Sequence, residues 1–118
     1  VAPVRAVYGN IDGTEIRSVW PKDNKFTLQG ATVWITHIGG YPNRYDRLVR
    51  DEIRQKPPNY FICGHSHILK VIPDKKLNLL HLNPGAIGKQ GFHQIRTMLR
   101  FKMEAGKIFD LEVVELKR

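Results

Sequence analysis

A short apolar segment in the middle of the chain connects a predicted helix end to a loop with two histidines. Pro57-Pro58 ends the helix, because proline lacks the backbone N–H that a helix interior needs. Tyr60-Phe61-Ile62-Cys63 then has the unbroken apolar character of a strand covered on both faces, and Gly64-His65-Ser66-His67 follows directly. A helix that leads straight into a covered strand is typical of α/β structure. We therefore expect an α/β fold.

The first half of the chain adds further elements to this prediction. Pro3–Tyr8 is a strand candidate that stops at a cluster of turn-forming residues. Lys25–Gln29 alternates with a period of two, and Gly30 is expected to join it to the apolar strand Ala31–Thr36 as a hairpin. Apolar residues recur at helical spacing between Arg44 and Gln55, with Asn43 as the predicted N-cap.

The second half of the chain changes character after the histidine loop. Leu69–Ile72 and Leu77–Leu82 flank a turn-forming Pro-Asp-Lys-Lys stretch, and Gln94–Met103 and Lys107–Leu116 flank Glu-Ala-Gly. Each pair predicts an antiparallel hairpin. The expected architecture is a mixed sheet followed by antiparallel hairpins.

Length and composition restrict the class of protein. A chain of 118 residues is expected to form one domain, residues 1–118. No apolar run is long enough to cross a bilayer, so we expect no membrane partner. The first eight residues lack the pattern of a secretory signal, and the single Cys63 cannot form an internal disulfide. These features predict a cytoplasmic protein.

The chain is basic, with 19 Lys and Arg against 11 Asp and Glu and a formal net charge of +8. Such a charge favours phosphate-bearing partners and leaves nucleic acid open as one of them. The basic residues are spread along the chain, however, without the aromatic and basic alternation that stacks bases. A mixed solvated surface is therefore favoured over a dedicated nucleic-acid face.

Polar side chains follow several of the predicted strands at the point where each ends. They are Asn10, His37, His65 and His67. In an α/β sheet the loops at the carboxyl ends of strands converge and form the ligand site. A lone histidine is more often a structural residue, but four such positions together favour a site. Neutral imidazole and amide oxygen are suitable ligands for Zn, Ni, Fe or Mn.

The motifs Gly9-Asn10-Ile11-Asp12, Thr36-His37, Gly64-His65-Ser66-His67 and Asn83-Pro84-Gly85 occur in this order. Together they resemble the calcineurin-like metallophosphoesterases, and most closely the small bacterial and archaeal phosphodiesterases of that superfamily. The resemblance implies an αββα sandwich, of which this chain would form the C-terminal part.

The resemblance also implies roles for individual residues. Asn10, His37 and His65 would bind one metal of a dinuclear pair and act as the catalytic residues, and His67 would bind the other metal. Asp12 would orient the ligands. Two such ions hold a hydroxide and stabilise the leaving oxygen of a phosphate ester. Tyr41 and Arg44, with Arg47, follow the His37 loop and are candidates to contact the substrate phosphate, whereas His81 and His93 are assigned structural or surface positions.

Two motifs that the family places before these residues, Asp-x-His and Gly-Asp, do not occur in this sequence. We therefore expect an N-terminally truncated domain that binds metal weakly, with one ion or none where the intact site holds two. The missing unit would leave a sheet edge and an apolar face uncovered, through which copies of the chain could associate. Ile11 cannot donate a proton, so we also expect a preference for substrates with good leaving groups.

The leading functional prediction is a metal-dependent phosphoesterase, a phosphodiesterase acting on a small phosphate ester, of which this chain is an impaired fragment. The alternative is a non-catalytic scaffold on the same fold, similar to the phosphodiesterase-like subunit of the retromer coat. A basic nucleic-acid module is the least favoured, because it makes no use of the histidines.

Overall fold

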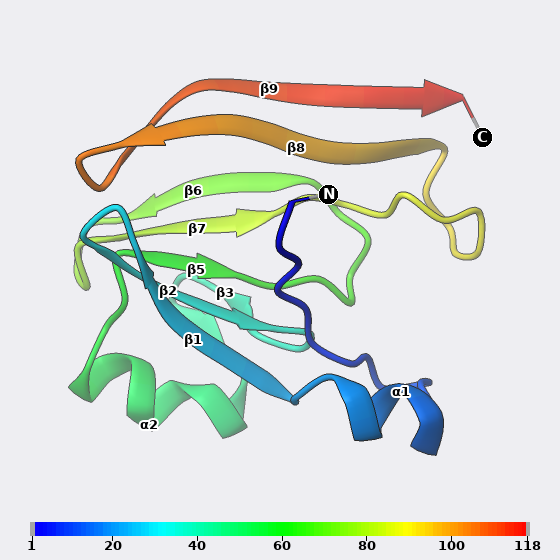
Figure 1. Cartoon of the computed structure of the whole chain (residues 1–118), viewed down its shortest axis with the longest axis horizontal. Helices are drawn as coiled ribbons and strands as arrows, with labels where there is room; N and C mark the ends of the chain where they lie inside the picture. Colours follow the sequence, from blue (N-terminus) through cyan, green and yellow to red (C-terminus); the bar gives the residue numbers. More distant parts are fainter. Residues whose placement is uncertain (1, 118) are drawn as a thin grey trace.

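The computed structural model describes residues 2–117 and builds them around a mixed sheet (Figure 1). The elements in chain order are α1 (Thr14–Val19), β1 (Asp23–Leu28), β2 (Ala31–Thr36), β3 (Gly40–Tyr41), β4 (Arg44–Tyr45), α2 (Arg47–Gln55), β5 (Tyr60–Ile62), β6 (Lys70–Asp74), β7 (Leu79–Asn83), β8 (Ile95–Glu104) and β9 (Lys107–Lys117). Five strands form the main sheet in the order β1-β2-β5-β7-β6, while β3-β4 and β8-β9 pair separately.

The strand pairing confirms the predicted α/β class with a mixed sheet. β2 and β7 lie parallel to β5 on its two sides, and the edge strands β1 and β6 run antiparallel to their neighbours. The β1-β2 hairpin closes through Gln29 and Gly30, which both have positive φ angles, of 51° and 84°. Two such residues give a turn whose twist matches that of the strands. Because β2 and β5 are parallel, their carboxyl ends lie at the same edge of the sheet.

The predicted start of the central helix is wrong by three residues. Gly40–Tyr45 forms the small β3-β4 hairpin, and Asn43 lies at its turn with a φ of 70°. The helix begins at Arg47, and its N-cap is Asp46, whose carboxylate accepts a hydrogen bond from the N–H of Leu48 at 3.0 Å. Its apolar face carries the buried Val49 and Ile53.

The N-terminal segment also departs from expectation. Pro3–Tyr8 forms no strand, because it runs beside the end of the sheet and no described strand pairs with it. The N–H of Tyr8 donates to the carbonyl of Pro21 at 3.1 Å, and the side-chain amide of Asn24 donates to the carbonyl of Ala6 at 3.4 Å. The short helix α1 was not predicted, since it buries no residue and so has no apolar periodicity to reveal it.

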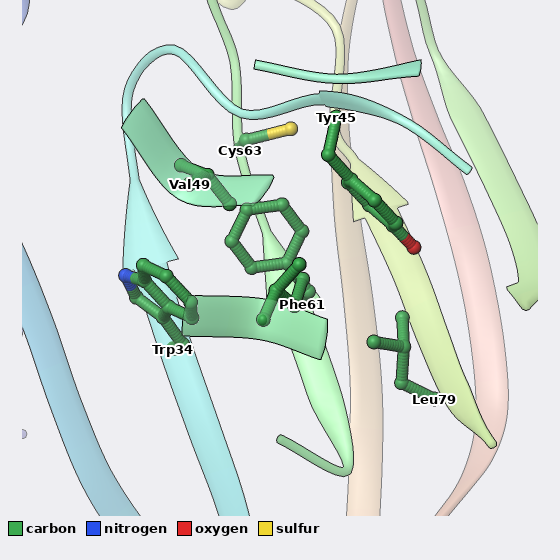
Figure 2. Packing of buried hydrophobic residues seen from close by; sticks show 7 residues of the cluster. Trp34, Tyr45, Val49, Phe61, Cys63 and Leu79 are labelled. Carbon is green, nitrogen blue, oxygen red and sulfur yellow. The ribbon is translucent and has the colours of Figure 1, made fainter. Parts of the chain in front are cut away.

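Successive side chains along the strands point to opposite faces of the main sheet, and both faces are covered. One face carries Trp34 and Phe61, which meet edge to face with ring centroids 5.2 Å apart and pack beneath α2 (Figure 2). Tyr45 from β4 packs against Phe61 at 5.8 Å, and Phe61 is fully buried. Within residues 2–117, no helix has the length and apolar character needed to cross a membrane.

The opposite face of the sheet is covered by the β8-β9 hairpin, which confirms the prediction of a C-terminal hairpin. Phe101, Met103 and Ile108 line a small apolar space against this face. The hydroxyl of Tyr60 donates to the carbonyl of Gly106 at 2.7 Å and accepts the N–H of Ile108 at 3.2 Å. The hairpin also keeps apolar surface open to solvent, including Ile95, Met98, Phe109, Val113 and Leu116.

Candidate metal centre

Three neutral donors from separate parts of the chain converge beyond the ends of β2 and β5. The side-chain oxygen of Asn10 lies 2.9 Å from Nε2 of His37 and 3.2 Å from Nδ1 of His65. The two imidazoles meet edge to face with ring centroids 5.2 Å apart. We call Asn10, His37 and His65 the donor triad. The structure thus brings together the three side chains that the family resemblance assigned to the first metal of the pair.

The distances within the triad fit the spacing of ligands around one metal ion. Bonds of about 2.1 Å to zinc separate neighbouring ligand atoms by roughly 3.0 to 3.4 Å, depending on coordination geometry. Without a metal, each imidazole N–H donates to the amide oxygen. To bind a cation through these nitrogens, each neutral imidazole must take the other tautomer, in which the proton sits on the second ring nitrogen.

His37 is held at the site by the backbone of the neighbouring loop. Its carbonyl accepts the N–H of Gly64 at 2.9 Å, which ties the end of β2 to the end of β5. Burial lowers the pKa of His37 below its usual value of 6.5, and the neighbouring His65 lowers it further. The neutral, ligand-competent form of this imidazole is therefore favoured near neutral pH.

Asp12 and Arg17 fix the loop that carries Asn10. The carboxylate of Asp12 accepts the N–H of Gly9 at 2.6 Å and so closes the turn around Asn10. The guanidinium of Arg17 donates to the carbonyls of Asp12 at 2.7 Å and of Asn10 at 3.3 Å. Asp12 thus contacts backbone beside the triad. Its orienting role stays a prediction.

The histidine loop has a strained backbone that its neighbours stabilise. His65 and His67 have φ angles of 70° and 62°, a left-handed conformation that costs an L-residue roughly 1 to 2 kcal/mol. Asn83, buried at the end of β7, donates its amide to the carbonyl of Gly64 at 3.2 Å and to the hydroxyl of Ser66 at 3.1 Å. The Ser66 hydroxyl also hydrogen-bonds with that of Tyr41.

Two residues after His37, the backbone packs too closely against its neighbours to allow any side chain at Gly39. A Cβ atom there would lie 2.7 Å from the ring of Phe61 and 2.8 Å from Cβ of Cys63. Next to it, the carbonyl of Gly40 accepts the Nε2–H of His81 at 2.9 Å. His81 is completely buried, so it has a structural position. Burial also raises the pKa of the Cys63 thiol to about 12, which agrees with a small core residue.

Among residues 2–117, His67 makes no hydrogen bond with a member of the donor triad, and its ring pairs with His93, which the sequence assigned to a structural or surface position. Its ring centroid is 5.1 Å from that of His93, whose Nε2–H donates to the carbonyl of Gly88 at 2.8 Å. Across residues 2–117, no group of three or more His, Cys, Asp or Glu side chains lies close enough to bind one metal ion. The donor triad contains only two histidines and an asparagine.

The candidate phosphate contacts lie at different distances from the site. Tyr41 contacts the histidine loop through Ser66, whereas Arg44 is exposed in the β3-β4 hairpin. Sequence reasoning named Asn83 and Ser66 only as members of the motifs that carry the family resemblance, and gave neither residue a role of its own. The contacts of Asn83 and Ser66 join elements that are distant in the sequence. The sequence signal that pointed to this region was a polar residue at the end of a covered strand.

Comparison with known proteins now places the chain in a family. The family model described as the calcineurin-like phosphoesterase superfamily domain matches residues 1–106. The chain belongs to the calcineurin-like phosphoesterase superfamily. This confirms the resemblance that the motifs indicated. A search of curated protein sequences gives no significant match.

Several solved structures share the calcineurin-like phosphoesterase fold of this chain. They include a Thermotoga maritima protein, TM1076 (21% identity, TM-score 0.65, 95% of this chain and 65% of that one), Entamoeba histolytica Vps29 complexed with zinc (14%, 0.68, 97% and 68%) and an archaeal phosphodiesterase (18%, 0.63, 93% and 67%). The chain therefore spans about two thirds of the length of these relatives, and at these identities the similarity establishes the fold.

Proposed function

We propose that this chain carries part of the active site of a metal-dependent phosphoesterase that acts on small phosphodiesters. The observation that carries the proposal is the convergence of Asn10, His37 and His65 around one point, with N···O distances of 2.9 and 3.2 Å. Membership of the calcineurin-like phosphoesterase superfamily supports it.

Asn10 Oδ1, His37 Nε2 and His65 Nδ1 would hold one divalent transition metal ion such as Mn, Ni, Zn or Fe. When bound, the ion would withdraw electron density from a phosphoryl group and offset the negative charge that develops during ester cleavage. All three donors are neutral, so no ligand charge offsets that of the cation, and we expect weak binding of a single ion. His67 would serve a second ion only with further ligands.

The remaining residues of the site would hold these donors in place. Asp12 and Arg17 fix the Asn10 turn, and Asn83 fixes the histidine loop through Gly64 and Ser66. Tyr41 reaches the same loop and is better placed than Arg44 to contact a substrate phosphate. Ile11 is 83% exposed and offers no proton to a leaving group, so activated esters should react best. The single cysteine agrees with action in the cytoplasm.

The test is metal binding and hydrolysis measured on the same protein. Titration of Mn²⁺ or Zn²⁺ into the chain by calorimetry should give about one site, which Asn10→Ala, His37→Ala and His65→Ala each weaken at least tenfold. Asn78→Gly is the matched control, because it removes an amide side chain at a turn residue whose φ of 54° suits glycine. Hydrolysis of bis(4-nitrophenyl) phosphate should follow metal occupancy. Unchanged affinity in all three variants would refute the triad as a metal site.

A second candidate function is a non-catalytic scaffold, and one specific observation favours it. Apolar side chains stay exposed on the β8-β9 hairpin, including Phe109 at 42% and Val113 at 45%. Contiguous apolar surface of this kind marks interaction sites, and the outer edge of β9 could pair with a strand of another molecule or of a second copy. Metal-free, inactive protein that forms a stable dimer in sedimentation experiments would favour this candidate.

A further inference from the structure

A cavity of about 410 Å³ opens beside the donor triad, and its volume lies in the range of pockets that bind small ligands. Asn10 and His37 line it beside uncharged residues such as Tyr8, Ile38 and Val49. Three cationic residues, Arg17, Lys22 and Arg47, also line it. These residues come from α1, from the segment before β1 and from the first residue of α2. Figure 1 shows α1 and the N-terminal end of α2 on the same side of the molecule.

The charge of this cavity is positive. Asp23 and Asp46 also line it, which leaves an excess of one positive charge over the three cations and two carboxylates. Both carboxylates have partners that fix them. Asp23 accepts the indole N–H of Trp34 at 3.0 Å, and Asp46 accepts the N–H of Leu48 at 3.0 Å as the helix cap. The N-terminal end of α2 adds a favourable dipole for an anion.

The guanidinium of Arg17 is already fixed at the cavity by contacts within the protein. It lies over the ring of Tyr8, 4.4 Å from the centroid, and two of its nitrogens donate to the backbone carbonyls of residues 10 and 12. In the described part of the chain, its third nitrogen, Nη1, has no protein acceptor. A fixed guanidinium loses little conformational entropy on binding and matches the geometry of phosphate oxygens.

We propose that the cavity binds a phosphate group of a small ligand and holds it next to the donor triad. If the triad acts on a phosphodiester as proposed above, the substrate class is then a small molecule with a second phosphate, such as a nucleotide with phosphates at both ends of the sugar. The anion site needs no metal, so it can be tested separately from the proposed hydrolysis.

The first experiment measures binding of thymidine 3′,5′-bisphosphate by calorimetry in EDTA at low salt. Saturable binding is expected, with Lys22→Gln and Arg47→Gln each weakening it roughly tenfold, as expected for the loss of one charged hydrogen bond. Arg50→Gln is the matched control, since Arg50 is an exposed residue of α2 that does not line the cavity. Circular dichroism checks that all variants are folded. No saturable binding, or an equal loss in the control, would overturn the proposal.

The second experiment uses metal-loaded protein and two substrates that differ by one phosphate. Thymidine 5′-(4-nitrophenyl phosphate) with a 3′-phosphate should have a KM roughly tenfold lower than the same ester without it, and Arg47→Gln should remove that advantage. Hydrolysis of neither ester, with binding in EDTA intact, would refute the phosphoesterase proposal alone. Hydrolysis of both with equal KM would refute the role of the cavity.

Discussion

Asn83 at the end of β7 donates its side-chain amide to the carbonyl of Gly64, 3.2 Å away, and so joins the centre of the sheet to the loop that carries His65. The same amide reaches the hydroxyl of Ser66 at 3.1 Å, while its oxygen accepts the N–H of Gly85 at 3.0 Å. One buried side chain thus connects two loops that are separated by the whole of the β6-β7 hairpin.

Replacement of Asn83 by alanine should therefore damage both stability and the site. The variant loses three hydrogen bonds whose partners are half-buried or exposed, and each such bond contributes about 0.5 to 1.5 kcal/mol to the free energy of unfolding. Metal affinity should fall as well, because the histidine loop loses its support. Urea unfolding and metal titration measure the two effects. Asn59→Ala is the control: Asn59 accepts hydrogen bonds from Thr32, far from the triad, so this variant should lose stability and keep its metal affinity.

Because the backbone of His65 is left-handed, two substitutions can separate the cost of backbone strain from the loss of the imidazole. His65→Ala and His65→Gly both remove the imidazole, so both should lose metal binding. Glycine adopts a φ of 70° without a steric penalty, so His65→Gly should be about 1 kcal/mol more stable than His65→Ala. Thermal unfolding compares the two. Equal stabilities would show that the loop relaxes around alanine and stores no strain at this position.

Acid should destabilise the protein through His81. Burial lowers the pKa of His81 below 6.5, so between these two values the unfolded chain binds a proton that the folded chain does not. From roughly pH 7.5 down to pH 5, the free energy of unfolding should fall, because the unfolded chain takes up the proton more readily than the folded chain. His37, whose pKa is also lowered, acts in the same direction. Urea unfolding across this range should show a shallower fall in His81→Gln. An identical profile would contradict the assignment.

Cys63 should react only when the fold opens. Its thiol is buried beside His81, and its pKa of about 12 leaves almost no thiolate at pH 8. The rate of modification by a disulfide reagent such as 5,5′-dithiobis(2-nitrobenzoate) should therefore rise with urea in parallel with the unfolded fraction. Rapid modification in native buffer would mean that the strand end at Cys63 opens locally, without global unfolding.

Local chemistry made some elements predictable from the sequence. Gln29 and Gly30 define the turn of the β1-β2 hairpin, and Ala105 and Gly106, which both have positive φ angles, define that of β8-β9. Two proline residues mark the boundary between α2 and β5. These signals lie within a few residues of the structure that they determine, so no knowledge of the rest of the fold was needed.

Other features depended on distant contacts and were missed. Residues 3–8 have strand-like composition, but a strand forms only where an edge is available to pair with it. Asn43 has the composition of a helix cap, yet the β3-β4 hairpin places it in a turn. At the site, the ends of β2 and β5 predicted that His37 and His65 would lie close together, whereas Asn10 joins them from a loop that follows no strand. The pairing of His67 with His93, which lies in the loop before β8, was not apparent from the sequence.

The Tyr60 hydroxyl joins the main sheet to the β8-β9 turn through the carbonyl of Gly106 and the N–H of Ile108. Thr97 makes the corresponding link at the other end of the hairpin, where its hydroxyl donates to the carbonyl of Pro84 at 2.7 Å. Between these two points, the described residues of the hairpin form no backbone hydrogen bond with the main sheet. The amide protons of the hairpin should therefore exchange with solvent as one cooperative unit, ahead of those in β2, β5 and β7, so that the C-terminal hairpin can detach while the triad keeps its support.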